Sequence, residues 1–176
     1  MMNIHLRKLE EKDAEGMLEW MHDADIQKNF RLDGSNKSKE DVIAFINDAE
    51  TTPVNGKSIH LAIADEHNEY LGTISLKNVD MEAKNAEYAI SLRKKAQGQG
   101  IGLEATRKVL SLAFEVYELE KVYLNVFSDN INAICLYEKC GFVCEGEFRR
   151  HLYLNGEYKS LKWYSMLKEE FQRNLK

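Results

Sequence analysis

The stretch that decides the fold of this chain is residues 93–102, RKKAQGQGIG, where three basic residues are followed by three of the chain's ten glycines. It comes after residues 85–92, NAEYAISL, whose two-residue alternation predicts a strand, and before an apolar pattern with helical spacing. Glycine has no Cβ, so the backbone there turns freely and can approach a ligand closely. At a helix N-terminus, unpaired N–H groups and the helix dipole favour negative charge, so this turn suits a pyrophosphate.

Two better-known phosphate motifs do not fit this stretch. A P-loop needs Lys-Ser or Lys-Thr after its last glycine, and neither pair follows Gly102. A Rossmann fingerprint has the spacing GxGxxG early in a βαβ unit, whereas GxGxG stands here in the second half of the chain. Two plainer interpretations stay open: the glycines form a strand-to-helix turn without a ligand, and the basic run is a solvated surface.

Composition limits the class of protein. The 176 residues, with one proline and no low-complexity run, predict one domain over residues 1–176. Charged residues come early in MMNIHLRKLEEKD, and no apolar run is long enough to span a membrane, so we expect neither a signal peptide nor a membrane partner. The net charge of −5 argues against nucleic acid as a partner. Cys135, Cys140 and Cys144 lack CxxC spacing and a fourth ligand, so we expect no metal and reduced thiols in a cytoplasmic protein.

Outward from the glycines, the periodicity predicts the order β-α-α-β-β-β-α-β-α-β-β. The predicted strands lie at residues 4–9, 59–64, 71–79, 85–92 and 121–127, with a hairpin over 142–167 that turns at Asn155-Gly156. The predicted helices are one around 14–21, one that Ser38 caps with Asp41, one over 102–117 and one at 131–140 that Asn130 opens and Gly141 ends. This order indicates an α/β (α+β) fold with a mixed sheet and packed helices.

Two motifs together resemble the GNAT superfamily of acyl-CoA-dependent N-acyltransferases. Its pyrophosphate loop has Gln or Arg, then Gly three residues on and Gly or Ala two further, which Gln97, Gly100 and Gly102 match. Its second motif, N-x-x-A-x-x-L-Y-x-x-x-G-F, is matched by Asn130, Ala133, Leu136, Tyr137, Gly141 and Phe142. The resemblance implies a mostly antiparallel sheet of about seven strands with helices on both faces.

The resemblance also implies where acetyl-CoA binds, namely between two splayed strands, residues 85–92 and 121–127. Pantetheine would pair with the first strand, the pyrophosphate would rest on the glycine turn, and asparagines of the next helix would contact the cofactor. The implied cofactor-binding residues are Ile90, Ser91, Leu92, Gln97, Gly98, Gln99, Gly100, Ile101, Gly102, Leu103, Asn130 and Asn132. Tyr137 would protonate the departing CoA thiolate; its plainer role is packing beside Leu136 and Phe142.

The reaction needs no nucleophile from the protein, because the amine attacks the thioester carbonyl directly. The amine must lose a proton, which calls for a general base or a water route. Glu87 is the candidate base, with a solvated carboxylate as the alternative, and Asn125 is a candidate for holding a water or the acceptor. No residue at a spacing typical of a catalytic pair accompanies His60 or His151, so we expect both histidines to be structural.

The acceptor is expected to be a small molecule amine or an amino sugar, ahead of a protein N-terminus, with a polyamine third. The C-terminal half resembles the branch that holds ribosomal-protein N-terminal and spermidine acetyltransferases, with amino-sugar enzymes related. A polyamine site needs several carboxylates, but FRLDGSNKS at residues 30–38 offers a single Asp beside Arg31 and Lys37. A non-catalytic acyl-CoA-binding module is the alternative from another class, and a homodimer is compatible with the resemblance.

Overall fold

The protein is described by a computed structural model that covers residues 3–31 and 33–174. Across these residues, seven strands form one sheet in the order β1-β2-β3-β4-β5-β7-β6. The strands are β1 (Ile4–Lys8), β2 (Ile59–Asp65), β3 (Tyr70–Asp80), β4 (Asn85–Leu92), β5 (Lys121–Phe127), β6 (Val143–Leu154) and β7 (Glu157–Leu167). All neighbours are antiparallel except β4 and β5, which are parallel. The predicted mixed, mostly antiparallel sheet is confirmed.

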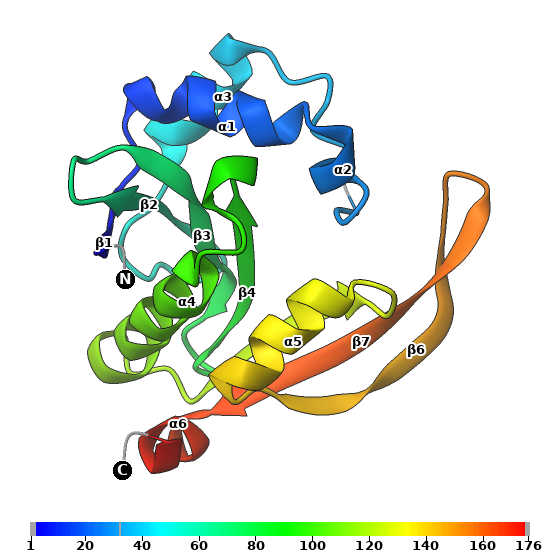
Figure 1. Ribbon diagram of the computed structural model, residues 1–176. Coiled ribbons are helices and arrows are strands. Elements are labelled where there is room, and N and C mark those ends of the chain that lie inside the picture. The colour runs from blue at the N-terminus through cyan, green and yellow to red at the C-terminus, as the bar shows by residue number, and fades with distance from the viewer. Residues whose placement is uncertain (1–2, 32, 175–176) are drawn as a thin grey trace.

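Helices cover the sheet on two sides (Figure 1). They are α1 (Ala14–Met21), α2 (Ala24–Gln27), α3 (Lys39–Asp48), α4 (Ile101–Ser111), α5 (Ile131–Cys140) and α6 (Lys168–Asn174). α1 and α3 pack together through one buried cluster that includes Met17, Trp20 and Val42. α4 and α5 pack on the opposite face over a larger cluster that includes Val109 and Ile134. The two faces of the sheet therefore have separate apolar cores.

Alternation along the strands determines which residues reach each core. In β4, Ala86 and Tyr88 are buried and belong to the core under α4 and α5, whereas Glu87 and Ala89 are half-buried on the other side. In an extended chain successive side chains point to opposite faces, so the alternation in the sequence determines which face each residue of β4 occupies. Each large apolar side chain buried in this way stabilises the fold by about 1.5–3 kcal/mol.

The predicted helix ends and turns are confirmed by the local geometry. Ser38 accepts a hydrogen bond from the Asp41 N–H, and the Asp41 carboxylate accepts one from the Ser38 N–H, which makes a capping box. Asn130 caps α5, and Gly141 ends it in the left-handed conformation. Asn155 and Gly156 both have positive φ, as a tight hairpin turn requires.

The structure differs from the predicted elements in length and in small additions. The helix predicted at 102–117 starts at Ile101 and changes at Leu112–Val116 into a π-helical turn. The short helices α2 and α6 were missed, as were the 3₁₀ turns Glu11–Asp13 and Lys94–Ala96. Such segments have too few residues for an apolar period to emerge; α2, for example, buries one residue, Ile26.

Candidate active site

The central opening of the sheet lies between β4 and β5. These strands pair only from Asn85 to Glu87 against Lys121 to Tyr123. Beyond Glu87, β4 stays bonded to β3 as far as Leu92, but its edge toward β5 has no further strand partner among the described residues. The predicted splay of the two strands is therefore present, and it leaves backbone groups of residues 88–92 available to an extended ligand.

The glycine turn follows β4, and its glycines are required for two different structural reasons. Gly98 and Gly100 have φ of 74° and 81°, and a Cβ built on either would meet no atom within 4 Å. This left-handed conformation favours glycine, and the space beside both α-carbons is open. We call this open turn the cradle. Gly102 differs, because its Cβ would lie 3.3 Å from the Leu136 side chain, so it serves the packing of α4 on α5.

The other implied cofactor residues lie around this turn. Gln97 and Gln99 are exposed, and the Gln97 side chain donates to the Leu92 carbonyl at 3.1 Å. Ile101 is buried at the start of α4, with Leu103 half-buried behind it. Asn130 uses its side chain to accept from the Ala133 N–H, and Asn132 is exposed on the first turn of α5.

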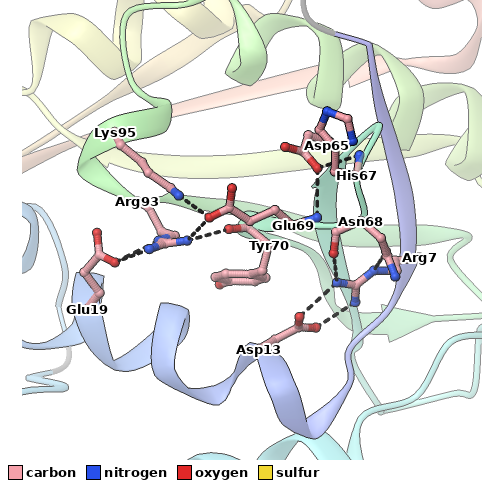
Figure 2. Close-up of polar contacts among 10 residues, drawn as sticks. All are labelled: Arg7, Asp13, Glu19, Asp65, His67, Asn68, Glu69, Tyr70, Arg93 and Lys95. Carbon is pink, nitrogen blue, oxygen red and sulfur yellow. Dashed lines mark hydrogen bonds and ion pairs between the residues drawn. The ribbon is translucent and has the colours of Figure 1, made fainter.

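The basic run before the glycines is paired within the protein (Figure 2). Arg93 bonds Glu19 of α1, Glu69 before β3 and the Tyr70 carbonyl, and Lys95 pairs with Glu69 as well. Lys94 is 3.8 Å from a carboxylate oxygen of Asp25. Arg93 is largely buried and ties α1 to the end of β4, whereas Lys94 and Lys95 are exposed and make ion pairs on the surface.

A second tie holds the other end of α1 (Figure 2). Arg7 of β1 donates two hydrogen bonds to Asp13, at 2.7 and 2.9 Å, and a further one to Asn68. Asp13 is 2% exposed, so this charge is compensated where it is buried. Together with Arg93, this pair fixes both ends of α1 against the sheet.

Tyr137 lies on the α5 side of the opening. It is 8% exposed, and its ring meets the edge of Tyr88 with centroids 5.7 Å apart and packs on Phe142. Tyr88 in turn hydrogen bonds Thr106, which donates to the Gly102 carbonyl at 2.6 Å. Burial, with a smaller contribution from Cys140, raises the pKa of the Tyr137 phenol above its ordinary value. The raised pKa keeps the phenol protonated at neutral pH, so its hydroxyl can donate a proton.

Glu87 is the last residue of β4 that pairs with β5, and its side chain points to the face of the sheet opposite Tyr88. Its side chain is 17% exposed, and its carboxylate accepts from Lys77 at 3.0 Å, Asn78 at 3.2 Å and Asn125 at 3.3 Å. The carboxylate is therefore held in place rather than solvated. Asn125 also accepts from Arg31, which lies in the segment after α2, with 3.4 Å between the nitrogen and the oxygen.

A cavity of about 150 Å³ lies on the same side as Glu87, between α1, α3 and the sheet. Its lining residues are Met17, Trp20, Met21, Phe45, His60, Thr73, Ser75, Ala89, Ile90 and Ser91. The Trp20 indole donates to the Tyr70 hydroxyl at 3.0 Å, and that hydroxyl bonds Thr73 at 2.7 Å, which holds the cavity wall. Burial, and secondly the charge of Lys77, lowers the pKa of His60 to about 4, so its imidazole is neutral at pH 7.

The sequence did not single out Thr73 and Ser75 as site residues. Their only signal was that they are polar residues in the otherwise apolar run of β3, on the face that alternation assigns to α1. Among the described residues no cluster of three His, Cys, Asp or Glu side chains could hold a metal ion, and no helix is long and apolar enough to cross a membrane.

Comparison with known proteins identifies the family of this chain. The Acetyltransferase (GNAT) domain family matches residues 3–143. A putative ribosomal N-acetyltransferase of Bacillus subtilis, YdaF, is 32% identical over 97% of this chain and 94% of its own length. Spermidine N(1)-acetyltransferase of Vibrio cholerae is 29% identical over 62% of this chain and 63% of that protein.

Solved structures share the fold. Spermidine N-acetyltransferase from Vibrio cholerae, solved in complex with CoA and spermine, superposes with a TM-score of 0.85 over 96% of this chain and 98% of that chain, at 24% identity. Together with the family match over residues 3–143, the relatives establish what kind of protein this is. The chain belongs to the GNAT acetyltransferase family and is an N-acetyltransferase, an enzyme that transfers an acetyl group to a primary amine.

Proposed function

We propose that this enzyme uses acetyl-CoA as its donor and acetylates the primary amine of a small molecule or an amino sugar. The observation that carries the proposal is the opening between β4 and β5, which has Tyr137 on one face of the sheet and Glu87 on the other. A thioester held in that opening would be reached by an amine from the Glu87 side. The leaving sulfur would then be reached from the Tyr137 side.

The donor would be held mainly by backbone. The unpaired edge of β4 around Ile90 to Leu92 suits the amide groups of pantetheine, because an extended ligand can add to a strand edge through main-chain hydrogen bonds. The open cradle at Gly98 and Gly100 suits the pyrophosphate, at the N-terminus of α4. Since Arg93 and Lys95 are already paired, the N–H groups of the turn are the main phosphate donors that we propose.

Proton transfers would be divided between two side chains. The thioester supplies an activated carbonyl, so the enzyme needs no nucleophile of its own. Glu87 would take the proton from the incoming ammonium, and Lys77, Asn78 and Asn125 keep its carboxylate oriented for that task. Tyr137 would give its proton to the CoA thiolate, which its protonated phenol allows.

A protein N-terminus is a second candidate for the acceptor, because the β6–β7 hairpin exposes aromatic side chains. Phe148, Tyr153 and Tyr158 are 51%, 63% and 56% exposed, and such residues often bind peptides. The Bacillus subtilis relative named as a putative ribosomal N-acetyltransferase points the same way. A homodimer and a cytoplasmic location stay predictions.

A thiol-release assay with acetyl-CoA tests the proposal. Amino sugars, simple amines, polyamines and short peptides are compared against a reaction without acceptor. Turnover of a small amine or amino sugar supports the proposal, and turnover of peptides alone favours the N-terminal candidate. Acetyl-CoA binding without turnover of any acceptor would leave only a binding module.

The Tyr137→Phe variant tests the mechanism. We expect kcat to fall by about 100-fold or more, the usual contribution of a general acid, while acetyl-CoA affinity stays close to that of the wild type. Tyr117→Phe is the control, since this tyrosine bonds the Thr51 carbonyl on the far end of the α4 region. An unchanged kcat in Tyr137→Phe would remove this residue as the acid.

A further inference from the structure

The carboxylate of Glu87 lies in a cluster whose formal charge is positive. Lys77 pairs with Glu87 at 3.0 Å, and this ion pair is formally neutral. Arg31 adds a second cation through Asn125, whose amide lies between the guanidinium and the carboxylate. Lys77, Glu87 and Arg31 together therefore have one positive charge more than negative.

Arg31 has no acidic partner among the described residues. The acid nearest to it in sequence, Asp33, accepts hydrogen bonds from Ser35 instead. The lining of the neighbouring cavity contains no Asp or Glu. An acceptor with several ammonium groups would thus meet Lys77 and Arg31 beside Glu87, and the described cavity lining offers no carboxylate to its second charge.

We propose that the acceptor carries an anionic group, a carboxylate or a phosphate, a few bonds from its primary amine, and that Arg31 binds this group. The proposal rests on the proposed function, with the amine placed at Glu87. A guanidinium forms two parallel hydrogen bonds with a carboxylate or phosphate, so the side chain suits that task. Arg31 is exposed and, within the described part of the chain, makes one long hydrogen bond, of 3.4 Å, so binding an anion would displace little.

The spacing between amine and anion follows from Asn125. One side-chain amide with its two hydrogen bonds separates Arg31 from Glu87. A spacer of about three to five methylene groups covers that reach. The series therefore centres on compounds whose amine and anionic group are at opposite ends, such as an ω-amino acid or an amino-sugar phosphate.

A matched series of acceptors tests the preference. At each spacer length, the far end of a primary amine is varied among methyl, carboxylate, phosphate and ammonium; butylamine, γ-aminobutyrate, aminopropyl phosphate and 1,3-diaminopropane form one such set. We expect kcat/KM for an anionic acceptor to exceed that for the methyl compound by about 10-fold or more, with the diamine below both. Comparing kcat/KM for the carboxylate and the phosphate acceptors shows which anion the site prefers.

Variants at position 31 connect the preference to the side chain. In Arg31→Gln, the ratio of kcat/KM for the anionic acceptor to that for the methyl acceptor should fall to near unity, and Arg31→Lys should restore part of it. Lys28→Gln is the control, because it removes a positive charge from the neighbouring segment, where Lys28 pairs with Asp25. A merely structural role for Arg31 would lower all acceptors alike and leave this ratio unchanged.

Two results would overturn the proposal. One is a wild-type enzyme that turns over the diamine as well as, or better than, the anionic acceptors, or that turns over none of the series. The other is an Arg31→Gln variant with the wild-type ratio. Failure of the proposed function is distinguishable, because it would appear as the absence of thiol release with every class of acceptor in the wider panel.

Discussion

At the scale of single residues, the burial of His60 in the cavity wall makes the stability of the protein depend on pH. Its ring packs on Phe45 with centroids 4.7 Å apart, and its Nδ1 is 2.7 Å from the Ser75 hydroxyl. Burial lowers its pKa to about 4, against 6.5 for an ordinary histidine. Between these two values the unfolded chain binds a proton that the folded protein does not, so the free energy of unfolding falls as the pH is lowered.

The pH dependence of unfolding tests this account of His60. In the wild type, this residue should remove up to about 3 kcal/mol of stability as the pH falls from 6.5 to 4. In His60→Gln the free energy of unfolding, measured by denaturant titration, should fall less over the same range. His67→Gln is the control, since that side chain is 83% exposed. Equal pH dependence in His60→Gln and the wild type would contradict the prediction.

At the scale of elements, the turn from β4 into α4 combines two demands on its glycines. Gly98 and Gly100 need positive φ, whereas Gly102 needs room beside Leu136. The sequence motif was therefore predicted correctly as a turn, but the reason for each glycine became visible only with α5 packed in place. The paired state of Arg93 and Lys95 belongs to the same scale, because it depends on where α1 and β3 bring Glu19 and Glu69.

Substitutions at Gly100 separate the backbone requirement from the approach of a ligand. Asn adopts positive φ more readily than other residues, so Gly100→Asn should keep most of the stability while placing a side chain in the open cradle. We expect acetyl-CoA affinity, measured by calorimetry, to fall by about 10-fold or more, since backbone N–H groups would no longer reach the phosphates. Gly100→Val should also lose about 1–2 kcal/mol of stability through backbone strain.

Gly156→Asn is the matched control for this test. Gly156 has φ of 84° and open space around its Cβ position, but it lies at the tip of the β6–β7 hairpin. Its variant should bind acetyl-CoA normally. Normal affinity in Gly100→Asn would mean that the glycine serves the turn alone.

At the scale of the whole molecule, the sheet consists of two groups of strands that pair with each other over a short stretch only. β1 to β4 form one antiparallel unit and β5 to β7 another, and the parallel β4–β5 pairing over three residues connects them (Figure 1). A ligand in the opening would contact strand edges that no other strand covers. We therefore expect acetyl-CoA to slow amide hydrogen exchange at residues 88–92 and 97–102, measured by mass spectrometry.

The β6–β7 hairpin supplies an internal reference for that measurement. Its outer part extends away from α5 in Figure 1, and exchange there at residues 150–158 should not change. Slower exchange throughout the chain would indicate general stabilisation rather than binding in the opening. Unchanged exchange at 88–92 would contradict the pairing of pantetheine with β4.

By itself the sequence determined the order of the elements, most of their ends and the family. These depend on local causes: alternation in β4, the caps Ser38 and Asn130, and the glycine turn with its following helix. Tyr137 and Glu87 were named as candidates from motif and strand position. Tyr137 packs on Tyr88 in the core under α4 and α5, Glu87 points to the other face of β4, and their catalytic roles stay predictions.

Only the tertiary structure decided which charges are available to a ligand. The basic run at residues 93–95 stood out in the sequence, yet carboxylates of α1, α2 and the start of β3 engage it. Arg31 lies in the polar segment after α2, and its side chain reaches Asn125, 94 positions further along the chain. An ion pair depends on distances between residues far apart in sequence, which no local pattern encodes, so the electrostatics of the site emerged only with the fold.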